Sequence, residues 1–481
     1  MINFGSFKFE DPAVQALVKK YEQMKEGGMH VFFESDELTL LAEYYASIQD
    51  GEAADEIIEY GLQLYPENLD LIVYHCQSLM AKGKVGEAEE IVSRLPDSSD
   101  YMVRLLKAEI CMNDGRSEEG EKIIRSLYDE DPDISVMLDI AQIYLNIQSL
   151  DKASVWLEKA YAEAPDDPDV LDMLSTFYFR TGNTEKEIEI YNKILDNDSY
   201  NVYAWQQLAR CYIRLEQPEK ALEAIGFAGA IDDTDQQTLE LEGLSHIMMN
   251  NIDEAISRLE SVKEGTKNRN YVHTLLLNCY TLKSDLGKIL KYSDLLLDDP
   301  DTEDERKSHI YYQRAAAYLE ANMVSECREE IKQGLSYNNY DPHLYQLVGE
   351  LYLRKNKKEE AKEAFMKAIG FADNPSEMID AITQVYLNYD CWADADDMLL
   401  ELEKVIDVKL NAYSIAFSYY LMEYSDMMIK YLVMAAVYTP YIFLNEDKNT
   451  YRIVEPKFVE ISREVFRKVK NHEIDVDDYL K

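Results

Sequence analysis

Residues 202–228, which read VYAWQQLARCYIRLEQPEKALEAIGFA, decide the fold of this chain. Counted from Val202 as position 1, small side chains stand at positions 8, 20 and 27, and large ones at positions 4, 11 and 24. This spacing is typical of two amphipathic helices whose small residues let the backbones approach while the large residues fill the remaining gaps. The stretch therefore predicts an antiparallel helix pair. Positions 4, 7, 8, 11, 20, 24 and 27 hold Trp205, Leu208, Ala209, Tyr212, Ala221, Ile225 and Ala228.

The same pattern recurs along the chain with a period close to 34 residues. Starting at Pro342, the same positions hold Tyr345, Val348, Gly349, Tyr352, Ala361, Phe365 and Ala368. A fixed period of this length is the signature of stacked helix-pair repeats. Extended outward, the pattern gives twelve repeats, spaced by 32 to 34 residues except for one step of 39. The predicted repeats begin at residues 35, 69, 101, 134, 168, 202, 236, 269, 308, 342, 376 and 409.

Stacked helix pairs predict an all-α solenoid, an α-α superhelix whose two ends need capping helices. Amphipathic segments suited to this role lie at 12–25 and 456–470. The 39-residue spacing follows the least regular repeat, which has Leu276 at position 8 and Lys288 at position 20. It indicates a joint between two halves of the solenoid or an enlarged surface loop. The predicted layout is an N-terminal cap (1–34), repeats one to eight (35–300), an acidic insertion or joint (301–307), repeats nine to twelve (308–440), and a C-terminal capping helix and tail (441–481).

The charge of the chain limits the classes of partner that it can bind. The formal net charge is −43, from 92 acidic and 49 basic residues. Such a chain repels phosphate backbones and anionic lipid headgroups and attracts basic segments. Neither a secretory leader nor an apolar run of membrane-spanning length is present in the sequence, and the six cysteines lie too far apart for a metal motif. We therefore expect a cytoplasmic protein with free thiols that binds neither nucleic acid nor membranes.

Motifs that carry catalytic chemistry are absent from the sequence. It contains no phosphate-binding GxxxxGK[ST] loop, dinucleotide GxGxxG, zinc-binding HExxH, nucleophile GxSxG or EF-hand loop. Acidic clusters such as 129–133 and 165–169 fall in the predicted turns, where aspartates that cap helix N-termini explain them. The sequence therefore predicts no enzyme activity, no cofactor and no metal site.

The repeat pattern of residues 202–228 and 342–368 resembles the tetratricopeptide repeat. The resemblance implies that positions 2, 5, 9, 12 and 13 of each first helix line a concave groove for extended peptides or helices. In repeats five and six, three arginines lie on this face of an otherwise acidic chain, and a guanidinium suits carboxylate recognition. The alternative is that the arginines pair with acidic neighbours. The candidate partner-binding residues are Thr176, Arg180, Tyr203, Gln206, Arg210 and Arg214.

A second candidate surface lies in the last repeat, where four aromatic residues follow an i, i+4, i+7, i+11 spacing. Such a stripe would hold an apolar peptide or a second subunit. The alternative is that the C-terminal helix covers it. The four residues are Tyr413, Phe417, Tyr420 and Tyr424.

These features predict a protein-interaction scaffold or adaptor that binds a peptide or helix of a partner in the groove. The expected ligand carries an acidic or carboxylate group or is a basic segment. The family's Lys and Asn clamp for a C-terminal carboxylate at positions 5 and 9 is not present, since Gln206 and Arg210 stand there in repeat six. The alternative function is a self-assembling structural protein that pairs with its own copies through the groove or the ends, which includes a homodimer.

Overall fold

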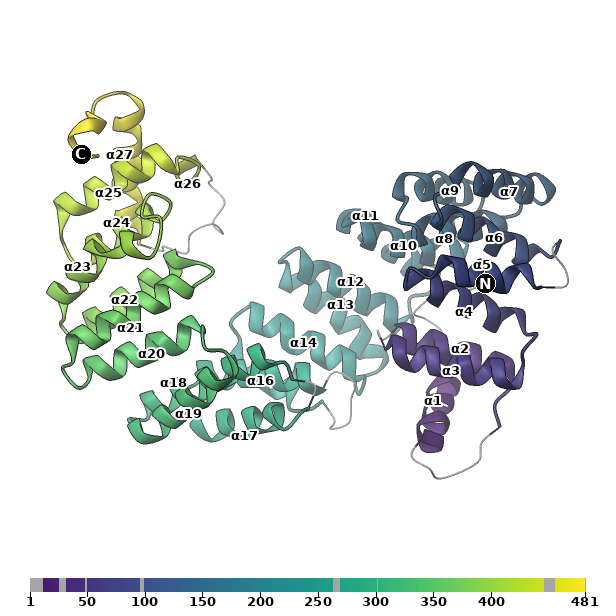
Figure 1. The fold of residues 1–481 in the computed structure, drawn as a ribbon, viewed down its shortest axis with the longest axis horizontal. Helices are drawn as coiled ribbons and strands as arrows, with labels where there is room; N and C mark the ends of the chain where they lie inside the picture. The colour runs from purple at the N-terminus through teal and green to yellow at the C-terminus, as the bar shows by residue number, and fades with distance from the viewer. Residues whose placement is uncertain are drawn as a thin grey trace. The chain divides into compact units, whose positions relative to one another are not determined.

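The computed structural model describes residues 12–25, 32–47, 50–95, 99–262, 269–300, 302–444 and 455–480. In these ranges the regular structure is α-helix with short 3₁₀ segments and no strand, so the all-α prediction is confirmed. Successive helices pair with their neighbours along the chain (Figure 1). The chain divides into an N-terminal module, residues 1–261, and a C-terminal module, residues 262–481. The joint predicted at 301–307 stays a prediction.

The N-terminal module contains a capping helix followed by seven helix pairs. Its helices are α1 (Pro12–Lys25), α2 (Ser35–Ser47), α3 (Gly51–Leu64), α4 (Leu69–Ala81), α5 (Val85–Ser93), α6 (Tyr101–Asn113), α7 (Ser117–Glu130), α8 (Ile134–Asn146), α9 (Leu150–Glu163), α10 (Pro168–Thr181), α11 (Thr184–Asn197), α12 (Val202–Arg214), α13 (Pro218–Ile231), α14 (Gln236–Met248) and α15 (Ile252–Leu259).

The C-terminal module contains five helix pairs and a terminal cap. Its elements are α16 (Arg269–Leu282), α17 (Leu286–Leu297), α18 (Asp304–Glu320), α19 (Val324–Tyr337), α20 (Pro342–Leu353), α21 (Lys358–Phe371), α22 (Pro375–Asn388), α23 (Trp392–Leu400), η2 (Leu402–Lys404), α24 (Ala412–Leu421), α25 (Ser425–Tyr438), α26 (Tyr441–Leu444), α27 (Pro456–Lys470) and η3 (Val476–Asp478).

Nine of the twelve predicted repeat starts coincide with the first residue of a helix. Helix α18 begins four residues earlier than predicted, at Asp304, because Asp304 and Glu305 favour the positive N-terminal end of a helix dipole. The acidic residues between repeats also act as caps, as expected. The Asp167 carboxylate, for example, accepts hydrogen bonds from the backbone amides of Asp169 and Val170 at the start of α10.

The turn inside repeats two to twelve has one shared conformation. After the first helix, one residue adopts the left-handed region, and the next amide donates to a carbonyl five residues back, as Asn183 N does to Tyr178 O at 2.9 Å. This is the Schellman ending of a helix. In repeat eight the left-handed residue, Ser284, comes one position later than in the other repeats when counted from the predicted start at residue 269, so the buried Leu277 and Ile289 take positions 8 and 20. The left-handed residues are Gly83, Gly115, Gln148, Gly182, Glu216, Asn250, Ser284, Asn322, Asn356, Asp390 and Glu423.

Small residues at position 8 allow the close helix pairing that the sequence predicts. At Gly349 in α20, an added Cβ would collide with the ring of Phe365 in α21, which is fully buried. The phenylalanine at position 24 thus fills the space that the glycine leaves open. Both predicted caps are confirmed: α1 buries Leu17 and Tyr21, and α27 buries Phe458.

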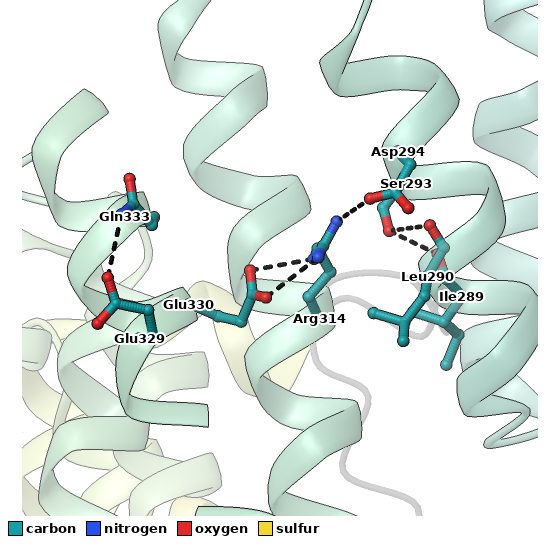
Figure 2. Close-up of polar contacts among 8 residues, drawn as sticks. All are labelled: Ile289, Leu290, Ser293, Asp294, Arg314, Glu329, Glu330 and Gln333. Carbon is teal, nitrogen blue, oxygen red and sulfur yellow. Dashed lines mark hydrogen bonds and ion pairs between the residues drawn. The ribbon is translucent and has the colours of Figure 1, made fainter. Parts of the chain in front are cut away.

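A largely buried arginine side chain ties three helices of the C-terminal module together. Arg314 in α18 lies between Asp294 of α17 and Glu330 of α19 (Figure 2). Its Nη1 pairs with Asp294, and its Nη2 donates to Glu330 Oε1 at 3.1 Å. The side chains of Arg314 and Glu330 are only 15% and 13% exposed, so the pair is shielded from water and salt.

Candidate functional site

Two columns of polar side chains run along the first helices of the N-terminal module. Helices α4, α6, α8 and α10 are successive neighbours in the stack (Figure 1). Positions 9 and 13 lie four residues apart, and residues four apart share one helix face. Position 9 supplies Gln77, Glu109, Gln142 and Thr176, and position 13 supplies Ala81, Asn113, Asn146 and Arg180.

Four of the position 9 and position 13 side chains of α4, α6 and α8 form one hydrogen-bonded chain. Gln77 Nε2 donates to Glu109 Oε2 at 3.2 Å, and Asn146 Nδ2 donates to Glu109 Oε1 at 2.7 Å. Gln142 Nε2 in turn donates to Asn146 Oδ1 at 2.7 Å. We call Gln77, Glu109, Gln142 and Asn146 the amide ladder. It presents peptide-like donors and acceptors along the stack, which is the chemistry that an extended backbone can match.

Two hollows open beside the amide ladder, and Gln77, Glu109 and Asn146 line both of them. The larger has a volume of about 810 Å³, and the smaller about 90 Å³. The larger falls within the range of ligand pockets, while the smaller holds a few water-sized groups. The larger hollow is also lined by Ala42, Ala46, Gly51, Glu52, Ala54, Asp55, Ile58, Tyr74, Ser78, Met80, Ala81, Lys82, Asn113 and Arg180.

Burial perturbs the carboxyl groups of this region. It raises the pKa of Glu109, against the effect of the hydrogen bonds from Asn146 and Gln77. Burial also raises the pKa of Asp139 in α8 to about 6, although the Tyr101 hydroxyl donates to Asp139 Oδ2 at 2.7 Å. The pKa of Asp172 in α10 is likewise raised to about 6 by burial. Glu109 and Asp139 both line the smaller hollow, and strongly desolvated carboxyl groups in a hollow are candidates for functional groups.

Of the six predicted groove residues, Arg180 and Thr176 lie on α10. Arg180 lines the larger hollow together with Asn113 and Asn146, and it is exposed. Its Nη1 donates to Leu145 O at 3.2 Å. Thr176 is half-buried at position 9 of the same helix. Arg180 is therefore the predicted side chain that the structure brings together with the amide ladder.

The other four predicted groove residues lie on α12. The Arg214 guanidinium pairs with Glu187, whose side chain is only 3% exposed. Arg210 Nη2 donates to Gln237 Oε1 at 3.3 Å. Arg214 therefore pairs with an acidic neighbour, as in the alternative given above, whereas Arg210 contacts a neutral amide. Tyr203 is half-buried.

Gln206 lies where the two helices α12 and α14 meet. It is fully buried, and its Nε2 donates to Thr238 Oγ1 at 3.0 Å and to Asp235 Oδ1 at 2.5 Å. Asp235 caps α14, so Gln206 extends this cap from the preceding repeat. Its amide is not available at the surface.

Most of the aromatic stripe in α24 is covered by α27. The rings of Tyr413, Phe417 and Tyr420 each pack on Phe458 of α27, with centroids 5.1 to 5.3 Å apart. Tyr424 is exposed and contacts Tyr419 of its own repeat. The arrangement matches the alternative in which the C-terminal helix covers the stripe.

The amide ladder was not predicted from the sequence. The signal that points to it is the recurrence of carboxamides at groove positions, at position 9 of repeats two and four (Gln77 and Gln142) and at position 13 of repeats three and four (Asn113 and Asn146). Among the described residues, no three His, Cys, Asp or Glu side chains are grouped as metal ligands. None of the described helices combines the length and the apolar character that a membrane crossing requires.

Comparison with known proteins gives two family matches. Residues 146–228 match the family described as "Anaphase-promoting complex, cyclosome, subunit 3", and residues 342–375 match the family described as "Tetratricopeptide repeat". The first match spans repeats that contain Asn146, Arg180 and Arg214, and the second spans one repeat in the C-terminal module.

Solved structures are similar to the chain at low identity. A tetratricopeptide repeat protein from Parabacteroides merdae is 20% identical, with 53% of this chain and 99% of that chain covered and a TM-score of 0.39. The APC/C hetero-tetramer Cut9–Hcn1 is 12% identical, with 93% and 98% covered and a TM-score of 0.33. YrrB, described as a TPR protein with an unusual peptide-binding site, is 16% identical, with 40% and 96% covered and a TM-score of 0.33.

The assignment of the chain to a repeat family rests on the helix pairs themselves. They recur at the predicted period, share one left-handed turn in repeats two to twelve, and place small residues where the paired helices approach. The family match at residues 342–375 falls on α20 and α21, the pair closed by Gly349 and Phe365. On these grounds the chain is a tetratricopeptide-repeat protein.

Proposed function

We propose that this protein is an interaction scaffold that binds an extended segment of a partner protein along the amide ladder. The observation that carries the proposal is the hydrogen-bonded chain from Gln77 through Glu109 to Asn146, which lines a hollow of about 810 Å³. An extended peptide has one donor and one acceptor per residue, and carboxamides offer both. The scaffold works by binding and not by catalysis, and the cytoplasm is its expected compartment.

The position of Arg180 supports the proposal that the bound segment carries an acidic or carboxylate group. It lines the same hollow as Asn113 and Asn146 and is exposed, whereas Arg214 is occupied by Glu187. A carboxylate bound by an exposed guanidinium forms a charge-assisted hydrogen bond. The ligand would then extend from the amide ladder toward α10.

The test selects random peptides displayed on phage against the full chain and measures the selected peptides by fluorescence polarisation. We expect Asn113→Ala and Arg180→Ala each to weaken binding by about three- to tenfold, because each removes one hydrogen-bonding group from the hollow. Arg125→Ala is the matched control, since Arg125 is 76% exposed on the second helix α7. Failure to recover any peptide, or equal binding by all three variants, would reject this site.

Self-assembly is the competing function, and sedimentation of the purified chain distinguishes the two. A scaffold that binds other proteins through its groove remains a monomer while its groove is empty. A concentration-dependent dimer that Arg180→Ala dissociates would instead assign the groove to a second copy.

A further inference from the structure

The smaller hollow beside the amide ladder is lined by apolar side chains and acids. Its wall contains Glu109, Asp139 and Asp169 and no lysine, arginine or histidine. The apolar part of the wall is formed by Val73, Met102, Leu105, Leu106, Leu138, Ile143 and Met173. The hollow is therefore both apolar and electronegative, in a module whose helices α4, α6 and α8 all contribute to it.

Glu109 is, with Asp139, one of two buried acids of this hollow. It is only 5% exposed, and in the described part of the chain its carboxylate meets the neutral amides of Gln77 and Asn146 but no cation. The two amides satisfy hydrogen-bond geometry but do not neutralise the charge. A buried carboxylate without a counter-ion is costly, and burial raises the pKa of Glu109 accordingly.

We propose that the smaller hollow is a subsite for one arginine or lysine side chain of the peptide that the groove binds. The methylene stem of such a side chain would lie against Leu105 and Leu138, and its cationic head would reach the Glu109 carboxylate. Each carboxylate oxygen of Glu109 has already accepted one hydrogen bond and retains a second lone pair for the ligand. Asp139 lies in the same wall and adds to the negative potential.

A basic side chain is favoured over a neutral or acidic one by the charges of this wall. The wall offers three acids and no base, so a cation gains where an anion would be repelled. The expected ligand then carries a basic residue at the amide ladder and an acidic or carboxylate group near Arg180. This subsite rests on the proposed function but names a chemistry that the groove alone does not require.

The experiment compares peptide selection by three forms of the full chain: wild type, Glu109→Gln and Glu118→Gln. Glu118 is an exposed residue of α7, so Glu118→Gln makes the same change in net charge away from the hollow. We expect wild type and Glu118→Gln to select peptides with arginine or lysine at one fixed place. Glu109→Gln should still select peptides but without this preference. Circular dichroism melts confirm that each variant is folded.

A selected peptide then provides the quantitative arm. Replacing its fixed arginine by citrulline, which has the same shape without the charge, should weaken binding to wild type by about tenfold or more. The same replacement should leave binding to Glu109→Gln unchanged. Selected peptides without a fixed basic residue, or equal behaviour of Glu109→Gln and Glu118→Gln, would overturn the subsite while leaving the peptide groove intact. If wild type selects no peptide at all, the groove and the subsite are both rejected.

Discussion

Asn146 Nδ2 donates to Glu109 Oε1 at 2.7 Å, although the two residues lie on the first helices of consecutive repeats. The bond joins α6 to α8 at the surface that faces the hollows, and Gln77 joins α4 to the same carboxylate. The groove surface therefore has an internal order before any ligand arrives, which reduces the entropy cost of binding.

Removing the Asn146 amide should destabilise the N-terminal module. Asn146→Ala leaves a buried carboxylate oxygen of Glu109 without its donor, and we expect a loss of about 1–3 kcal/mol in the free energy of unfolding. Urea titration followed by circular dichroism measures it. Asn113→Ala is the matched control, because the Asn113 amide donates to the Glu109 main-chain oxygen and not to the carboxylate. Equal losses in both variants would contradict the structural role given to the Asn146–Glu109 bond.

Protonation of Asp139 should make the fold more stable at mildly acidic pH. Its pKa is about 6 in the folded chain against 3.8 ordinarily, so the folded state holds the proton more tightly. The resulting stabilisation is fully present below about pH 4 and is lost as the pH rises through about 6. Asp139→Asn removes the charge. At pH 7.5 it should raise the melting temperature, with a gain on the order of 1–3 kcal/mol in the free energy of unfolding. At pH 4 it should leave the melting temperature unchanged.

The control for the pH effect is Asp196→Asn, since Asp196 is exposed on α11. Its melting temperature should follow that of wild type at every pH. If the difference in melting temperature between wild type and Asp139→Asn is the same at pH 4 and at pH 7.5, the titration of the Asp139 carboxyl group is not its cause.

Of the arginines on the groove face, Arg214 should stabilise the fold and Arg180 should not. Arg214→Ala strips the ion pair from Glu187, whose side chain is 3% exposed, and we expect a cost of about 1–3 kcal/mol. Arg180→Ala should change stability by no more than about 0.5 kcal/mol, because Arg180 is exposed. Thermal melts of the two variants decide this, and the reverse order of stability would be inconsistent with the pairing of Arg214.

Left-handed turn residues offer a direct route to greater stability. Gln148 has a φ of 57°, a conformation that costs an ordinary residue about 1 kcal/mol and costs glycine little. We expect Gln148→Gly to stabilise the chain by about 0.5–1 kcal/mol in thermal melts. Gln148→Ala retains the strain and should give no gain. A loss of stability in the glycine variant would mean that the Gln148 side chain contributes more than its strained backbone costs.

The helix frame was predictable because it depends on local spacing. The small residue at position 8 and the large one at position 24 determine how the two helices of a repeat fit, as Gly349 and Phe365 show. The shared left-handed turn was not predicted, because glycine occupies that position in only three of the eleven repeats where the structure describes it. Other residues adopt the same φ there under the constraint of the closed helix pair.

The candidate site was only partly predictable because it depends on contacts between repeats. Arg180 was identified from its helix face, and it does line the larger hollow. Gln206 lies on the same predicted face but is buried by α14. The pairing of Glu109 with Gln77 and Asn146 depends on how far one repeat is displaced from the next, and a helical wheel of a single repeat does not contain that displacement.

The position of Arg314 bears on how the C-terminal module would respond to mechanical load. Because one guanidinium binds acids on both α17 and α19, tension applied to either helix is transmitted to the other through α18. A repeat joined to its neighbour only by apolar contacts can peel away side chain by side chain. Here the Arg314–Asp294 ion pair also joins α18 to α17 of the preceding repeat, so α17, α18 and α19 should yield to a pulling force together, as one mechanical block longer than a single repeat.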